Sequence, residues 1–229
     1  RRASPQGALL EGEPQWNPCL PSTDNKSDIY DLGFVEAVLD QVSSDYLVDR
    51  NRVYAVGYSN GGMMSYGLAM HKSDLITAFG SVSGTMLDCG EQPNHPMPVI
   101  VMHGTNDFTI PYDGSSDTVS IETTIDYWNS FNNTNTTPVL TSASDVGEKG
   151  SSVEIERYQY SDGDNGSSVE LYKIVGGGHD WFARRFDGQH PGQILLNVFS
   201  QYDLNTLLSP NRLSRASSAA FHHFSISLE

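Results

Sequence analysis

Hydrophobic and polar positions along this chain follow two periods, one typical of strands and one typical of helices. Alternating or continuously apolar runs predict strands at residues 52–56, 78–84, 98–104, 154–160 and 169–175. Apolar positions three and four residues apart predict helices at residues 28–46, 63–70, 120–131 and 193–208. Because helices and strands take turns through the first half of the chain, we expect a three-layer α/β domain with a mostly parallel sheet.

Stretches with neither period separate these elements. Residues 1–29 have the Pro, Gly, Asn and Ser content of loops, and residues 132–149 are expected to form a surface loop or an edge strand. The pattern fades after residue 208. We therefore expect a single domain over residues 1–209 and an irregular tail over residues 210–229.

Charge and hydropathy narrow the range of partners. Among 229 residues, 28 are Asp or Glu and 13 are Lys or Arg, which gives a formal net charge of -15. Such a field repels the phosphates of nucleic acids and of anionic membranes, and no apolar run approaches the ~20 residues of a membrane span. We expect no nucleic-acid or membrane partner. We also expect a secreted or periplasmic protein whose signal peptide is not part of this chain, and leave a cytoplasmic location open.

One turn between a predicted strand and a predicted helix has the spacing of a catalytic motif. Gly57, Ser59 and Gly61 form a G-x-S-x-G sequence directly after the strand at residues 52–56. In that context the glycines allow a sharp turn that holds the serine hydroxyl above the sheet edge, as a nucleophile requires. The alternative is a Gly-rich turn that only packs a helix against the sheet. An acid and a histidine at other strand ends would favour the first interpretation.

The ends of two later strands carry those partners. Asp107 follows the strand at residues 98–104, and His179 follows the strand at residues 169–175 after three glycines. The carboxyl ends of parallel strands meet at one edge of a sheet, and the chain order Ser, Asp, His is that of α/β-hydrolases. An imidazole can take the serine proton if a carboxylate orients it. We predict Ser59 as nucleophile, His179 as base and Asp107 as orienting acid.

Other histidines and acids compete for these roles. His103 lies at the end of the strand before Asp107, and we interpret it as a structural hydrogen-bond donor. His190 precedes a proline at a helix start and is interpreted as a surface residue. Asp113 and Asp117 are interpreted as caps of the following helix.

The cysteines and acidic clusters do not predict a metal site. Cys19 and Cys89 lack zinc-ligand spacing, and two alternatives stay open for them: a disulfide, or two free buried thiols. The acidic run at residues 162–166 has the composition of a hairpin turn and does not match a calcium loop. We expect no metal and no cofactor.

Several short motifs, spread from about residue 4 to residue 208, recur together in one enzyme family. They are Pro5-Gln6-Gly7, Trp16-Asn17, Asp31-Leu32-Gly33-Phe34, Val48-Asp49, Arg52-Val53-Tyr54, Gly57-Tyr58-Ser59-Asn60-Gly61-Gly62-Met63, His103-Gly104-Thr105-Asn106-Asp107, Ile110-Pro111-Tyr112 and Gly176-Gly177-Gly178-His179-Asp180-Trp181. In these motifs the chain resembles the α/β-hydrolases that comprise polyhydroxybutyrate depolymerases and related feruloyl and acetyl-xylan esterases. The resemblance implies an α/β-hydrolase fold, a triad of Ser59, Asp107 and His179, and hydrolysis of esters of small acids or of hydroxy-acid polymers.

The front of the chain departs from that family's pattern. Before the match to residues 5–7, family members carry several strands, a helix and a His-Gly loop that supplies part of the oxyanion hole. We therefore expect an N-terminally abbreviated fold in which the backbone N–H of Asn60 is the remaining oxyanion donor. Missing strands would leave a sheet edge uncovered, which favours a homo-oligomer or a second piece of the protein.

The leading hypothesis is a serine carboxylesterase that hydrolyses esters of short-chain, hydroxy or aromatic acids through an acyl-enzyme. Trp16, Tyr58 and Trp181 are candidates for lining the substrate pocket, and the alternative for the two tryptophans is that they only pack the walls of the site. Two other functions stay open. One is a serine peptidase or acyltransferase with the same triad, and the other is a non-catalytic binding module with a hydrolase fold.

Overall fold

The computed structural model describes residues 2–20, 28–146, 152–181, 185–208 and 222–228. Its centre is an eight-stranded sheet in the order β1-β10-β4-β5-β6-β9-β8-β7. The strands of this sheet are β1 (Arg2–Ala3), β4 (Val48–Tyr58), β5 (Ala78–Val82), β6 (Val99–Gly104), β7 (Val139–Val146), β8 (Ser152–Tyr160), β9 (Val169–Ile174) and β10 (His222–Leu228). The pairs from β1 to β9 are parallel, whereas β8 and β7 are joined in antiparallel pairs at one edge. A separate hairpin consists of β2 (Ala8–Leu10) and β3 (Glu13–Gln15), so the prediction of loop for residues 1–29 is wrong for these strands and for β1.

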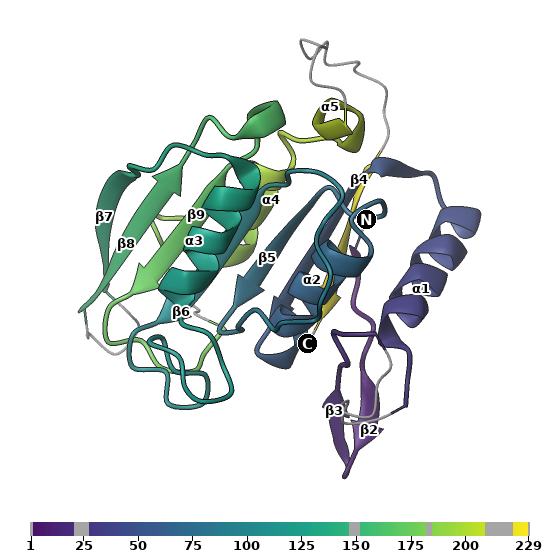
Figure 1. The fold of residues 1–229 in the computed structure, drawn as a ribbon, viewed down its shortest axis with the longest axis horizontal. Coiled ribbons are helices and arrows are strands. Elements are labelled where there is room, and N and C mark those ends of the chain that lie inside the picture. Colours follow the sequence, from purple (N-terminus) through teal and green to yellow (C-terminus); the bar gives the residue numbers. More distant parts are fainter. Residues whose placement is uncertain (1, 21–27, 147–151, 182–184, 209–221, 229) are drawn as a thin grey trace.

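Helices cover both faces of the sheet (Figure 1). On one face lie α1 (Asp31–Asp45), α2 (Asn60–His71) and α3 (Ile121–Asn132), and on the other lies α4 (Pro191–Phe199), which is followed by the short α5 (Leu204–Leu208). Each face has its own apolar cluster, the larger one under α1 to α3. The predicted three-layer α/β architecture is confirmed.

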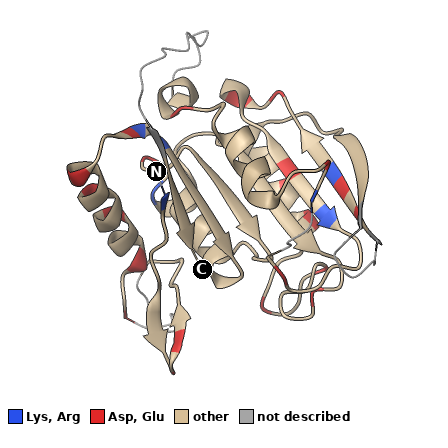
Figure 2. Ribbon diagram, turned by 180° about the vertical axis from the view of Figure 1, so that it is seen from behind, with Lys and Arg blue, Asp and Glu red and all other residues tan. Residues whose placement is uncertain are grey.

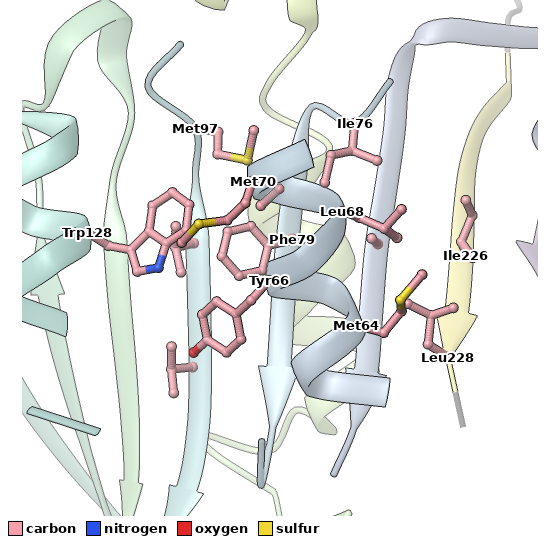
Figure 3. Packing of buried hydrophobic residues seen from close by; sticks show 14 of the residues in the cluster. Met64, Tyr66, Leu68, Met70, Ile76, Phe79, Met97, Trp128, Ile226 and Leu228 are labelled. Carbon is pink, nitrogen blue, oxygen red and sulfur yellow. The ribbon is translucent and has the colours of Figure 1, made fainter. Parts of the chain in front are cut away.

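The larger cluster is centred on α2 (Figure 3). Tyr66 of α2 contacts Phe79 of β5 with 5.1 Å between ring centroids, and Phe79 contacts Trp128 of α3 at 4.9 Å. Met64 lies toward Leu228 of β10 on the other side of the helix. Because most residues of α2 are buried between the sheet and the neighbouring helices, the position of its first turn after Ser59 is tightly defined.

The predicted strands are all present, and two predicted helices differ in detail. The helix predicted at residues 193–208 is divided into α4 and α5 because Asp203 starts a new helix: its Oδ1 accepts from the N–H of Thr206 at 2.9 Å. In α1 the buried apolar positions are Leu32, Val35 and Leu39, whereas Phe34, which has the helical spacing of a core residue, is 43% exposed. Residues 139–146 form an edge strand, one of the two alternatives for their segment.

The prediction of an irregular C-terminal tail is wrong for residues 222–228. They form β10, which pairs in parallel with β4 on one side and with β1 on the other. Phe224, Ile226 and Leu228 are buried in the larger cluster, and the serines between them face the opposite side of the sheet. That alternation is a strand signal visible in the sequence. β4 therefore has a neighbouring strand on each side, and the homo-oligomer expected from an uncovered sheet edge stays a prediction.

Acidic residues are spread over the molecule (Figure 2). They lie along α1 and in loops at both ends of the sheet, and the few Lys and Arg positions are scattered among them. Within the described ranges, no helix combines the length and the apolar character needed to cross a membrane. The described acidic residues are thus distributed over several elements and not gathered in one.

Candidate active site

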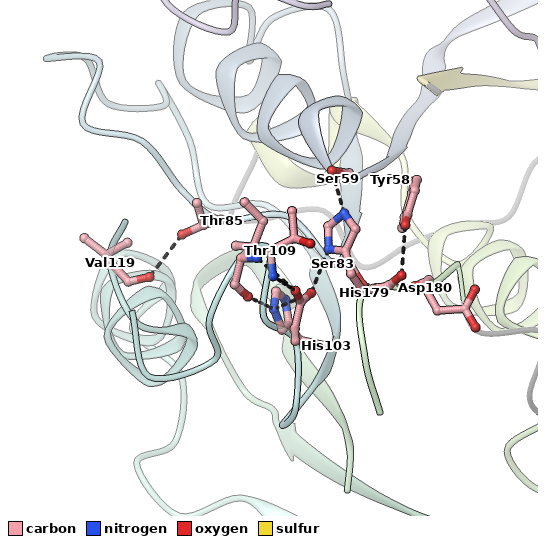
Figure 4. Close-up of polar contacts among 11 residues, drawn as sticks. Tyr58, Ser59, Ser83, Thr85, His103, Thr109, Val119, His179 and Asp180 are labelled. Atoms are coloured by element: carbon pink, nitrogen blue, oxygen red, sulfur yellow. Dashed lines mark hydrogen bonds and ion pairs between the residues drawn. The ribbon is translucent and has the colours of Figure 1, made fainter. Parts of the chain in front are cut away.

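The turn between β4 and α2 has the geometry of a nucleophile elbow (Figure 4). Ser59 has φ 53° and ψ -118°, a left-handed conformation that non-glycine residues adopt at a cost of about 1–3 kcal/mol. Its N–H donates to the Val82 carbonyl at 2.9 Å, and its own carbonyl accepts from the N–H of Met63 at 3.0 Å. A Cβ on Gly57 would collide with the Gly61 carbonyl, so the turn requires a glycine two residues before the serine.

A hydrogen-bond chain joins Ser59, His179 and Asp107. His179 Nε2 lies 2.8 Å from Ser59 Oγ, and its Nδ1 lies 2.8 Å from Asp107 Oδ2. In the tautomer that carries its proton on Nδ1, the imidazole donates to Asp107 and accepts from the Ser59 hydroxyl. The three residues come from the ends of β4, β6 and β9, as the strand pattern predicted. The arrangement can activate a serine hydroxyl as a nucleophile.

His103 lies beneath Asp107 and outside this chain of hydrogen bonds. It is fully buried, its Nε2 donates to the Ile110 carbonyl at 2.8 Å, and the same nitrogen is 3.3 Å from Asp107 Oδ2. Burial lowers the pKa of His103 below its ordinary value of 6.5 and outweighs the nearby carboxylate. His103 is thus a neutral structural donor at pH 7, the role that the sequence indicated.

The other competing residues are not the partners of His179, whose two ring nitrogens contact Asp107 and Ser59. His190 is exposed and precedes α4. Asp113 and Asp117 are also exposed, and the interpretation that they cap α3 is wrong. That helix is capped by Ser120, whose side chain accepts from the N–H of Thr123 at 3.0 Å.

Two residues that the sequence did not single out for this role hold the loop of His179 in place. The Tyr58 hydroxyl donates to the His179 carbonyl at 3.2 Å, and the Ser83 hydroxyl donates to the Asp180 carbonyl at 2.9 Å. Burial raises the pKa of Tyr58, which keeps its hydroxyl protonated as a donor. Ser83 is buried at the end of β5 with φ 50°, a position with no motif of its own. Ser83 can reach Asp180 only because β9, which precedes the loop of His179, lies two strands from β5 in the sheet.

The aromatic candidates have different surroundings. Trp181 is 36% exposed and packs edge-on against Tyr58, with 6.2 Å between ring centroids. Tyr58 in turn lies 5.1 Å from the His179 ring. Trp16 is only 2% exposed, stacks on Phe34 and belongs to the larger apolar cluster, so its indole is not exposed to a ligand. Trp181 and Tyr58 thus remain the candidates for contact with a substrate.

Asn60, the first residue of α2, follows the nucleophile directly. The N–H groups of a first helical turn have no partner within the helix, and the helix dipole adds positive potential there. The backbone N–H of Asn60 is therefore suited to an oxyanion on a carbon attacked by Ser59.

Cys19 and Cys89 form a disulfide with 5.2 Å between their Cα atoms, so the disulfide is the alternative that the structure contains. At residues 162–166, Asn133 and Asn135 donate to the carboxylates of Asp164 and Asp162, which supports the hairpin-turn interpretation. Within the described part of the chain, no group of three or more His, Cys, Asp or Glu residues is arranged to hold a metal ion.

Comparisons with known proteins show the family and the fold of this chain. Residues 8–142 match the family described as Phospholipase/Carboxylesterase. A probable feruloyl esterase C from Aspergillus niger is 37% identical over 84 residues, which cover 37% of this chain and 31% of that protein. A putative esterase, NocK, from Nocardia uniformis subsp. tsuyamanensis is 35% identical over 113 residues, covering 48% of this chain and 33% of the relative. Each match thus spans about a third of the relative's length.

Among solved structures, an acetyl xylan esterase from Aspergillus awamori superimposes with a TM-score of 0.53 at 14% identity. The superposition covers 84% of this chain and 75% of that one. At this identity the likeness establishes a common fold.

Proposed function

This chain belongs to the phospholipase/carboxylesterase family and has the α/β-hydrolase fold, and from that premise we propose that it is a serine carboxylesterase acting through an acyl-enzyme. The observation that carries the proposal is the continuous hydrogen-bond chain from Ser59 through His179 to Asp107, with 2.8 Å at each link. These are the distances at which an imidazole can take a hydroxyl proton while a carboxylate orients it.

In the proposed reaction, Ser59 Oγ attacks the ester carbonyl carbon while His179 Nε2 takes the hydroxyl proton. Asp107 stabilises the imidazolium that forms, and the N–H of Asn60 donates to the oxyanion of the tetrahedral intermediate. His179 then gives its proton to the leaving alcohol, which leaves the acyl group on Ser59. A water molecule, activated by the same imidazole, hydrolyses the acyl-enzyme and restores the serine.

The acyl group is proposed from the relatives and from the side chains beside His179. The relatives named feruloyl esterase and acetyl xylan esterase support esters of aromatic or short-chain acids, and the exposed face of Trp181 supports an apolar or aromatic acyl group. Hydroxy-acid esters, and with them a likeness to polyhydroxybutyrate depolymerases, remain part of the proposal. A secreted or periplasmic location is supported by the Cys19–Cys89 disulfide, which is typical of oxidising compartments.

The test is hydrolysis of p-nitrophenyl acetate by the wild-type protein and by Ser59→Ala. We expect the substitution to lower kcat at least about 10⁴-fold, because the attacking oxygen is lost. It should also abolish labelling by a fluorophosphonate. Ser44→Ala, an exposed hydroxyl on α1, is the matched control and should keep full activity. Undiminished turnover by Ser59→Ala would contradict the assignment.

The same assay separates the other functions. A panel of acetyl, butyryl, feruloyl and hydroxybutyrate esters, compared with amide substrates and with alcohol acceptors, distinguishes an esterase from a peptidase or an acyltransferase. A wild-type protein that neither turns over an ester nor reacts with a fluorophosphonate would favour the non-catalytic binding module.

A further inference from the structure

The side chain of Asn60 holds the backbone of a residue 44 positions earlier in the chain. Its Oδ1 accepts from the N–H of Trp16 at 2.5 Å, and its Nδ2 donates to the Trp16 carbonyl at 3.1 Å. One amide therefore satisfies both peptide groups of a single residue, as a neighbouring strand would. We call this pair of hydrogen bonds the amide clasp.

The backbone held by the clasp is itself fixed to three other parts of the fold. The N–H of Asn17 donates to Asp31 Oδ2, in the first turn of α1, at 2.7 Å. Pro18 runs so close to α2 that a Cβ on Gly67 would collide with its carbonyl. Cys19 is bonded to Cys89 in the loop after β5. Residues 16–19 are thus a strap, tied to α1, α2 and that loop, to which the clasp attaches the elbow.

The elbow needs such an attachment. Ser59 is held in a left-handed conformation that is not favoured by itself, and such strain persists only where the surroundings over-determine the backbone. The peptide that links Ser59 to Asn60 carries the N–H that faces the developing oxyanion. Because the clasp begins at the Cβ of Asn60, it limits rotation of the residue whose N–H must point at the substrate.

We propose that the Asn60 side chain is a positioning residue, which with the strap holds the N–H of Asn60 in the direction of the oxyanion. The proposal rests on the esterase function proposed above and adds a role that the G-x-S-x-G pattern does not specify. The clasp is made in the ground state and touches no substrate, so its effect is expected in the transition state through the direction of one donor.

The chain contains a matched control for this interaction. At the end of α3, Asn132 Oδ1 accepts from the N–H of Met97 at 3.0 Å, and its Nδ2 donates to the Met97 carbonyl at 2.7 Å. This second clasp has the same chemistry and is fully buried, but it lies at the start of β6, at the opposite end of that strand from Asp107. Removing it costs a comparable pair of hydrogen bonds without touching the elbow.

The experiment compares Asn60→Ala, Asn132→Ala and the wild-type protein. Three quantities are measured: kcat and KM for p-nitrophenyl acetate per folded molecule, inhibition by phenylboronic acid, and the midpoint of urea unfolding. Phenylboronic acid forms a reversible tetrahedral adduct on the serine oxygen and so reports on the oxyanion site. For Asn60→Ala we expect kcat to fall about 10- to 100-fold with KM nearly unchanged, and boronate affinity to fall in parallel.

Asn132→Ala should unfold at lower urea concentration than the wild type and keep the wild-type kcat and boronate affinity. The inference is overturned if Asn60→Ala keeps the wild-type kcat per folded molecule, or if its kcat falls while boronate affinity does not. It is also overturned if both variants lose activity only in proportion to their unfolded fraction. An inactive wild-type protein would instead overturn the proposed function, and this is decided before any variant is compared.

Discussion

The two oxygens of the Asp107 carboxylate have different partners. Oδ1 accepts from the N–H groups of Thr109 and Ile110 at 2.9 and 2.8 Å, and Oδ2 faces His179 Nδ1 at 2.8 Å. The turn after β6 therefore sets the rotation of the carboxylate, and the buried charge is supplied with donors from the backbone. At the scale of single residues, backbone N–H groups in the turn that follows Asp107 orient its carboxylate toward His179.

Asp107→Asn tests this orientation. The backbone donors should retain the amide oxygen, so the amide NH₂ would face His179 Nδ1 and stabilise the tautomer whose Nε2 is protonated. That imidazole cannot take the serine proton, and kcat for p-nitrophenyl acetate should fall about 10³- to 10⁴-fold with the fold intact. Asp113→Asn, at an exposed carboxylate a few residues later, is the control. A loss of less than tenfold would argue against Asp107 as the orienting acid.

At the scale of elements, α2 is packed against its neighbours at backbone distance. A Cβ on Gly61 would collide with the carbonyl of Leu228 in β10, and one on Gly67 would collide with that of Pro18. The second glycine of the G-x-S-x-G motif therefore serves the contact between the elbow helix and the C-terminal strand. The elbow and β10 are positioned together.

Gly61→Ala should displace either β10 or the start of α2. We expect a loss of about 1–3 kcal/mol in the free energy of unfolding, because the atom that the methyl group meets belongs to a strand backbone. Gly192→Ala in α4 is the matched control, since a Cβ there meets nothing within 4 Å. That change should stabilise the protein by about 0.4–1 kcal/mol. Urea unfolding measures both, and equal stability of the two variants would contradict the close contact.

At the scale of the whole molecule, segments far apart in sequence complete one sheet. β1 and β10, from opposite ends of the chain, lie side by side and continue the sheet beyond β4 (Figure 1). The disulfide between Cys19 and Cys89 joins the strap to the loop after β5 across 70 residues. It therefore encloses α1, β4, the elbow, α2 and β5 in one covalent loop.

Replacing both cysteines by serine should lower stability through the freedom that the unfolded chain regains. A loop of 70 residues corresponds to a loss of about 4 kcal/mol in the chain-entropy estimate, and measured losses are commonly smaller. The free energy of unfolding in urea, measured without reductant, checks this value. Adding reductant should bring the wild-type protein to the stability of the double variant and leave the variant unchanged; a wild type insensitive to full reduction would contradict the prediction.

Local patterns were sufficient for the elements between residues 31 and 208 and for the candidate triad, but they missed β1, β2, β3 and β10. Ser59, Asp107 and His179 each follow a strand that is recognisable from its own residues, and parallel strands bring their carboxyl ends to one edge for a general geometric reason. In α1 the helical period identified Val35 and Leu39 as buried positions. It gave the same core spacing to Phe34, which is exposed and stacks on the buried Trp16. The central strands, the helices that cover them and the order of the three residues were thus determined by the sequence.

Contacts between distant segments were decided by the tertiary structure. The clasp between Asn60 and Trp16, the bond from Ser83 to the loop of His179, and the insertion of β10 beside β4 all join groups far apart in the chain. Periodicity shows which face of an element is apolar, but it does not show which segment covers that face. The hydrophobic effect is non-directional, so many different segments could bury the same apolar face equally well. Hydrogen bonds and close backbone contacts select one partner, and they exist only once the chain has folded.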